Sequence, residues 1–196
     1  MDTAVRFVGI GEKSVGKVLE HARLIGAETS EYSLELVNFD HGSIDWRGSL
    51  GGVHWLLLSS SNVIHSQNSK SAHGAAMTFS ELEGSRVVMI VDLPDEEERL
   101  IEAWGFVIER IRQINILYIT SDAISHIASI EQMSEKELLE EIRIRGMVPQ
   151  VLTIDPNGKV RIFHSLGDLN LPSNSRNNFS WLATYLCQLP NVSHLN

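Results

Sequence analysis

The chain has 196 residues, enough for one well-buried domain, and its 43% hydrophobic and 21% charged residues are ordinary for a soluble globular protein. Its formal charge of −9 argues against general binding to nucleic acid or to an anionic membrane surface. No apolar run approaches the ~20 residues that span a bilayer, and the N-terminus lacks the basic flank of a signal peptide. The single cysteine, Cys187, has no internal disulfide partner, so a cytoplasmic location is expected.

The first predicted elements are a strand at Val5–Val8, a glycine-rich turn at Gly9–Lys17 and a helix whose apolar residues include Val15, Leu19 and Ala22. Strand, glycine turn and helix form the context in which backbone N–H groups hold phosphate. Gly9, Gly11, Gly16 and Lys17 are therefore candidate nucleotide-binding residues.

Two phosphate-binding patterns overlap in this turn. Gly11 and the pair Gly16-Lys17 have the Walker A spacing, but Val18 stands where a serine or threonine would reach magnesium. Gly9 and Gly11 open a dinucleotide-type or tubulin-type loop, but the carboxylate of Glu12 would repel phosphate unless it points outward. The alternative is that these glycines only form a tight turn between strand and helix.

Further along the chain, short and almost continuous apolar runs indicate strands that are buried on both faces, as in a parallel sheet. The expected strands are Leu34–Phe39, Val53–Leu58, Val87–Val91, Asn115–Ile119 and Val151–Ile154. Helical apolar stripes lie between them, at residues 72–82, 100–111 and, after a capping box formed by Ser134 and Glu137, at 138–142. Alternating strands and helices predict a three-layer, Rossmann-like α/β sandwich.

The C-terminal part changes character. Asp155–Gly158 is a strong turn signal, which predicts a β-hairpin between Val151–Ile154 and Val160–Phe163. A polar loop at residues 170–178 and a last helix follow. We expect one domain over residues 1–189, with a flexible tail at 190–196.

The polar stretch Ser59–His73 is expected to be a loop. Ser59–Ser61, Asn62 and Lys70 offer polar groups that can bind an anion. Asp92, which ends an apolar strand, would hold magnesium through water in a P-loop enzyme and is otherwise a loop acid. The histidines lack the spacing of a zinc site. No catalytic residue and no metal site are predicted.

The order of these segments resembles that in the nucleotide-binding domain of FtsZ, the bacterial tubulin homologue, over roughly residues 4–145. The matching segments are Val5–Gly11, Leu34–Asp40 as the second strand, Gly52–Leu58, Ala72–Ala76, Val87–Pro94 and Trp104–Asp122. This resemblance implies a tubulin-like fold and adds Asp40 and Gly74 to the candidate nucleotide-binding residues, beside Ser59 and Ser60.

The chain departs from that family at the phosphate loop, because residues 59–73 contain no glycine, and only glycine lets backbone pack on phosphate at positive φ. After Ile142 it also lacks the family's catalytic acidic loop. The resemblance thus implies an FtsZ-like domain that has lost GTPase activity and acts by self-association or through a cytoskeletal or division-type protein partner. The alternative is a functional GTP- or ATP-binding protein, an NTPase if it is an enzyme, that uses the glycine turn 9–17.

Overall fold

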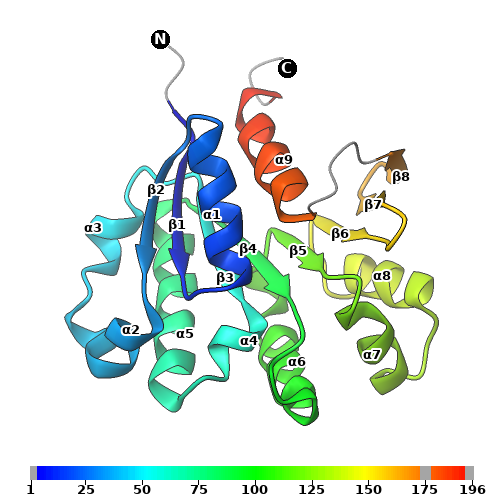
Figure 1. Ribbon diagram of the computed structural model, residues 1–196, viewed down its shortest axis with the longest axis horizontal. Helices are drawn as coiled ribbons and strands as arrows, with labels where there is room; N and C mark the ends of the chain where they lie inside the picture. The colour runs from blue at the N-terminus through cyan, green and yellow to red at the C-terminus, as the bar shows by residue number, and fades with distance from the viewer. Residues whose placement is uncertain (1–3, 173–177, 193–196) are drawn as a thin grey trace.

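The computed structural model describes residues 4–172 and 178–192, which form one eight-stranded sheet with helices on both faces (Figure 1). The strands lie in the order β2-β1-β3-β4-β5-β6-β7-β8. The first six are parallel, and β7 and β8 are antiparallel to their neighbours. Their bounds are β1 Arg6–Ile10, β2 Glu28–Tyr32, β3 Trp55–Ser59, β4 Arg86–Val91, β5 Ile116–Ile119, β6 Gln150–Ile154, β7 Lys159–His164 and β8 Gly167–Pro172.

The helices divide into two layers, each with its own apolar core. One core lies under α1 (Ser14–Leu24) and α9 (Asn178–Val192), which pack side by side (Figure 1). The second core lies between the opposite face of the sheet and the remaining helices. These are α2 Leu34–Asp40, α3 Trp46–Leu50, α4 Ser60–Val63, α5 Gln67–Glu83, α6 Leu100–Glu109, α7 Ala123–Ile130 and α8 Glu135–Ile144, with short 3₁₀ helices at His41–Ser43, Glu97–Arg99 and Ile111–Gln113.

This architecture confirms the predicted α/β sandwich with a mostly parallel sheet, a C-terminal hairpin and a last helix. The central strands were recognisable because both of their faces are buried: every residue of β3 and β5 is buried, as are Val87–Val91 of β4. The turn at Asp155–Gly158 joins β6 to β7 as expected. The capping box of Ser134 and Glu137 begins α8.

The second strand was placed wrongly. Leu34–Phe39 belongs to α2, and the strand that pairs with β1 is the earlier segment Glu28–Tyr32. That strand lies at the edge of the sheet and is polar and partly exposed, so it carries no apolar run. The polar stretch 59–73 is likewise not a loop, because α4 and the first turns of α5 occupy most of it.

The C-terminal segment also differs in detail from the expectation. Part of the expected loop 170–178 belongs to β8, and residues 173–177 lie outside the described part of the chain. Helix α9 continues through Pro190 to Val192, so the first residues of the expected tail are helical. Residues 193–196 also lie outside the described part.

Crossing a bilayer requires a longer and more apolar helix than any found in residues 4–172 and 178–192.

Candidate functional site

The strand order creates one topological switch point, between β1 and β3. From β1 the chain moves outward to β2, whereas from β3 it moves the other way to β4. The connections after these two strands therefore separate, which leaves a crevice beyond the carboxyl ends of the strands. In open α/β sheets this is the place where ligands bind.

A cavity of about 300 Å³ lies at this point. Its walls come from the segments that follow four neighbouring strands: β1, β2, β3 and β4. The lining residues are Glu12, Lys13, Leu34, Ser61, Asn62, Ile64, His65, Pro94, Asp95, Glu96 and Arg99.

The turn after β1 forms one wall and has an unusual backbone. Gly11 has a φ of +99°, and a Cβ atom there would lie 2.1 Å from Nδ2 of Asn62. Lys13 has a φ of 53° and a ψ of −107°, an unfavourable combination for a residue with a side chain. The turn thus brings the chain close to Asn62 and aims Lys13 over the cavity before α1 begins at Ser14.

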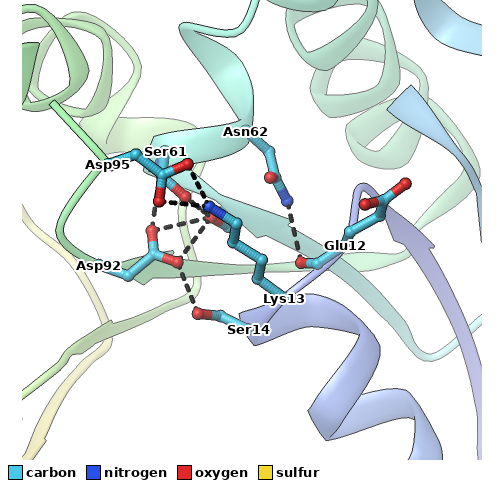
Figure 2. A network of polar contacts seen from close by, with 8 residues as sticks. Glu12, Lys13, Ser14, Ser61, Asn62, Asp92 and Asp95 are labelled. Atoms are coloured by element: carbon cyan, nitrogen blue, oxygen red, sulfur yellow. Dashed lines mark hydrogen bonds and ion pairs between the residues drawn. The ribbon is translucent and has the colours of Figure 1, made fainter. Parts of the chain in front are cut away.

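Below the cavity, the buried carboxylate of Asp92 joins three segments (Figure 2). It accepts hydrogen bonds from the hydroxyl of Ser14 at 2.6 Å, from the hydroxyl of Ser59 at 2.8 and 3.0 Å, and from the backbone N–H of Ser61 at 3.2 Å. The hydroxyl of Ser60 lies 3.3 Å from both the backbone oxygen and the backbone nitrogen of Asp92. Because Ser14 is the first residue of α1, the carboxylate also lies where the helix dipole favours negative charge.

At the mouth of the cavity, Lys13 reaches across to Asp95, as Figure 2 shows. Its Nζ atom lies 2.5 and 2.6 Å from the two carboxylate oxygens. Both side chains are largely exposed, at 57% and 86%, so this ion pair contributes little to stability and is screened by salt. A polar ligand can therefore bind either Lys13 or Asp95 in place of the other with little loss of stability.

A second set of hydrogen bonds fixes Asn62. Its Nδ2 donates to the backbone oxygen of Glu12, and its own backbone oxygen accepts from the hydroxyl of Ser69. The backbone oxygen of Ser69 in turn accepts from Nδ1 of His73, at 2.7 Å. Burial lowers the pKa of His73 to about 4, so this imidazole is neutral at pH 7.

Three of the residues predicted from the sequence come together here. Gly11 forms the turn after β1, Ser59 ends β3, and Ser60 begins α4, all within the network around Asp92 and Asn62.

The other five predicted residues lie elsewhere. Gly9 allows Val15 and Leu19 of α1 to pack on β1, and Gly74 lies in the middle of α5 against the guanidinium of Arg110. Gly16 lies in α1 near Glu31, and Nζ of Lys17 lies 5.4 Å above the ring of Phe179 in α9. Asp40 ends α2, and its side chain is outside the described part of the structure. Whether any of these residues contacts a nucleotide stays a prediction.

The sequence reasoning did not single out Lys13, Asp95 or Arg99 as site residues. A usable signal existed, because Lys13 and Asp95 each follow an apolar strand by a few residues, and in a parallel sheet all such segments meet at one edge. What the sequence could not supply was the strand order, which decides whether those segments are neighbours.

The position of Gly11 leads to a stability prediction. We expect Gly11→Ala to lower the free energy of unfolding by about 1–3 kcal/mol, because alanine is strained at φ +99° and its Cβ would meet the buried Asn62. Gly26→Ala is the matched control, since Gly26 has a φ of +96° with nothing within 4 Å of the added Cβ. Urea unfolding of both variants measures the difference, and equal losses would contradict a close contact at Gly11.

The cavity offers hydrogen-bond donors and acceptors in similar numbers. Lys13, Arg99 and Asn62 can donate, while Glu12, Asp95 and Glu96 can accept. Three carboxylates against two permanent cations suit a ligand rich in hydroxyl groups better than a bare polyphosphate. Within the described residues, no group of three or more histidine, cysteine, aspartate and glutamate side chains is placed to hold a metal ion.

No protein-family model matches the sequence, and none of the curated proteins is detectably similar to it. The fold, in contrast, is similar to that of several sugar and nucleoside kinases. Fructokinase from Vibrio cholerae, with fructose, ADP and calcium bound, has a TM-score of 0.73 and 8% identity, over 96% of this chain and 85% of that chain. Aminoimidazole riboside kinase from Salmonella enterica, with aminoimidazole riboside and an ATP analogue, has a TM-score of 0.70 and 9% identity, over 95% and 85%. Fructokinase from Xylella fastidiosa has a TM-score of 0.66 and 12% identity, over 97% and 68%.

These likenesses overturn the resemblance to FtsZ and, with it, the interpretation of the chain as a tubulin-like domain that has lost GTPase activity. The structural neighbours are carbohydrate and nucleoside kinases. The FtsZ match depended on the order of strand ends, which many open α/β sheets share, and its second strand was the segment that forms α2. At 8–12% identity the comparison establishes the fold alone, a Rossmann-like α/β sandwich that these kinases also have.

Proposed function

We propose that this protein binds a small polyhydroxylated molecule, a sugar or a nucleoside, in the cavity at the β1–β3 switch point. The observation that carries the proposal is the cavity itself, which is lined by a mixture of donors and acceptors that includes the exposed ion pair of Lys13 and Asp95. Carboxylates accept hydrogen bonds from hydroxyl groups, and the cations donate to them. The fructose and aminoimidazole riboside bound by two proteins of the same fold belong to this chemical class.

Isothermal titration calorimetry with fructose, ribose, adenosine and inosine tests this proposal. We expect at least one of them to bind with a stoichiometry of one. Asp95→Ala should weaken that binding about tenfold, since it removes a charged acceptor from the cavity. Glu98→Ala is the matched control, because Glu98 belongs to the same acidic run but does not line the cavity. The proposal fails if none of the four compounds binds at millimolar concentration, or if both variants weaken binding equally.

A nucleotide is the second candidate ligand. Supporting observations are the ADP and the ATP analogue bound by proteins of this fold, and the position of the α1 N-terminus beside the cavity. The two lysines of the glycine turn separate two modes of binding. If phosphate lies in the cavity, Lys13→Ala removes the rise in melting temperature caused by magnesium ATP or GTP, and Lys17→Ala leaves it intact. A Walker-type mode predicts the reverse. ADP formed in the presence of a bound sugar would extend the proposal to phosphoryl transfer.

A further inference from the structure

A second polar pocket lies at the edge of the sheet opposite β2, where the hairpin strands β7 and β8 meet α8 (Figure 1). Its volume is about 190 Å³, which at ~30 Å³ per water molecule is the space of about six waters. A phosphate group with a short carbon chain fits this space. The polar residues of its lining are Lys136, Lys159, Arg161, Asp168 and Asn170.

The register of the hairpin brings these side chains onto one face of the sheet. Phe163 of β7 is buried in the core beneath α8, and alternate residues of a strand share a face, so Lys159 and Arg161 lie on the same side. Asn170 of β8 pairs with Arg161, and Asp168 pairs with Phe163. Two neighbouring strands therefore present their polar residues to the pocket together.

The cations of this pocket are not neutralised by neighbouring acids. In the part of the chain that the structure describes, the side chains of Lys159 and the partly buried Arg161 have no ion-pair partner. Lys136 lies 3.4 Å from Glu140, but the two side chains are 69% and 42% exposed, so this pair is weak and exchangeable. Asp155, in the turn before Lys159, accepts from two backbone N–H groups of that turn and does not line the pocket.

We infer that this pocket binds the phosphate group of a small hydroxylated phosphate monoester. Three cations and one carboxylate line it, in a chain whose formal charge is −9, so the pocket is locally positive. The guanidinium of Arg161 suits two oxygens of one phosphate, and the ammonium groups and the amide of Asn170 add further donors. The carboxylate of Asp168 would repel a bare phosphate but accepts a hydrogen bond from a hydroxyl group on the rest of the ligand. This inference does not depend on the cavity at the β1–β3 switch point.

The test titrates the full, isotope-labelled chain with glycerol 3-phosphate at low ionic strength and follows the backbone amides by NMR. We expect saturable shifts concentrated at residues 159–170, with a Kd in the millimolar range or below. Glycerol should cause none of these shifts, and inorganic phosphate should require several times the concentration because it offers no hydroxyl group on a carbon chain to Asp168. Added salt should weaken binding, since the charges are partly exposed. Equal shifts with glycerol, or none at residues 159–170, overturn the inference.

Variants locate the binding and separate the two contacts. Arg161→Gln should weaken it about tenfold, whereas Arg112→Gln, which removes an exposed cation outside the pocket, should not. Lys159→Gln, at an exposed position, should weaken it severalfold, so the result does not depend on the stability of the Arg161 variant. Asp168→Asn should strengthen binding of inorganic phosphate and reduce the preference for glycerol 3-phosphate. Equal effects of the two arginine variants overturn the site, and an unchanged preference in Asp168→Asn overturns the monoester as its ligand.

Discussion

Asp92→Ala is expected to lower the free energy of unfolding by about 3–5 kcal/mol, although Asp92 does not line the cavity. Its buried carboxylate accepts hydrogen bonds from Ser14, Ser59 and the backbone of Ser61, and these bonds hold the start of α1, the end of β3 and α4 against the end of β4. Removing the carboxylate leaves buried donors without an acceptor, and bonds to a charged group are individually worth about 1.5–3 kcal/mol. Urea denaturation, monitored by tryptophan fluorescence, measures the loss.

Two companion variants identify the cause. Asp92→Asn keeps one oxygen acceptor, and serine hydroxyls can turn to meet its amide group, so about half of the loss should be recovered. Asp95→Ala removes the same type of side chain from an exposed ion pair and should cost less than about 1 kcal/mol. If Asp92→Ala were as mild as Asp95→Ala, the carboxylate would not hold the three segments together.

The structure of this network explains why Ser59 and Ser60 were candidate binding residues and Asp92 was not. Ser59 and Ser60 were candidates because they carry hydroxyl groups in the segment where the FtsZ resemblance puts a phosphate loop. That segment follows a buried parallel strand, which can be recognised from its apolar run alone. Asp92 follows a run of the same kind, but its role depends on β3 and β4 being neighbours. Sequence patterns do not contain that adjacency, so Asp92 could be interpreted only as a magnesium ligand or a loop acid.

Lys17, the lysine of the glycine turn that was predicted to bind phosphate, does not line the cavity, and the physical reason is different. Helix α1 begins at Ser14, after a residue whose side chain makes no capping hydrogen bond, so the sequence contains no signal for its first turn. With that boundary unknown, Lys13 and Lys17 are equally plausible over a phosphate. Lys17 lies about one helical turn after Lys13. It is part of α1 and lies against Phe179 of α9, whereas Lys13 precedes the helix and stays in the glycine-rich segment beside the cavity.

The edge strand β2 was missed because its pairing does not depend on burial. Glu28–Tyr32 has no buried residue, and its parallel pairing with β1 is held by backbone hydrogen bonds that any residue except proline can form. The more apolar segment Leu34–Asp40 attracted the strand prediction instead, although a helix buries Val37 in the core equally well. A short apolar run alone does not distinguish a strand from one or two turns of helix.

The second large prediction concerns pH. His73 is fully buried, and burial lowers its pKa to about 4, against a value near 6.5 in the unfolded chain. Between these two values the unfolded state binds the extra proton, so stability rises with pH in this range. The free energy of unfolding therefore has its full value, as far as His73 is concerned, above about pH 6.5, and it decreases as the pH falls toward 4. One pKa unit corresponds to about 1.4 kcal/mol, so the total loss is about 3 kcal/mol.

Comparison with variants isolates this contribution from that of the carboxylates. His73→Leu removes the titration and should flatten the dependence of unfolding free energy on pH between 6.5 and 4, whatever its effect at pH 7. His126→Gln is the matched control, because Nδ1 of His126 also donates to a backbone oxygen four residues earlier, at 2.8 Å, but on an exposed helix face. Urea titrations at half-unit pH steps compare the slopes. A wild-type slope that His73→Leu leaves unchanged would show that the buried imidazole accepts its proton without unfolding.

Ser69 connects His73 to the cavity: its backbone oxygen accepts from His73, and its hydroxyl donates to the backbone oxygen of Asn62. Protonation of His73 should therefore also affect ligand binding in the cavity. Charging the imidazole in this buried position disfavours the packed arrangement of α4 and α5, on which the position of Asn62 beside Gly11 depends. We therefore expect binding of any cavity ligand to weaken as the pH approaches 4 in the wild type and to do so less in His73→Leu. Calorimetric titration at pH 7 and pH 4 checks this, and an equal loss in both proteins would assign the pH effect to the carboxylates that line the cavity instead.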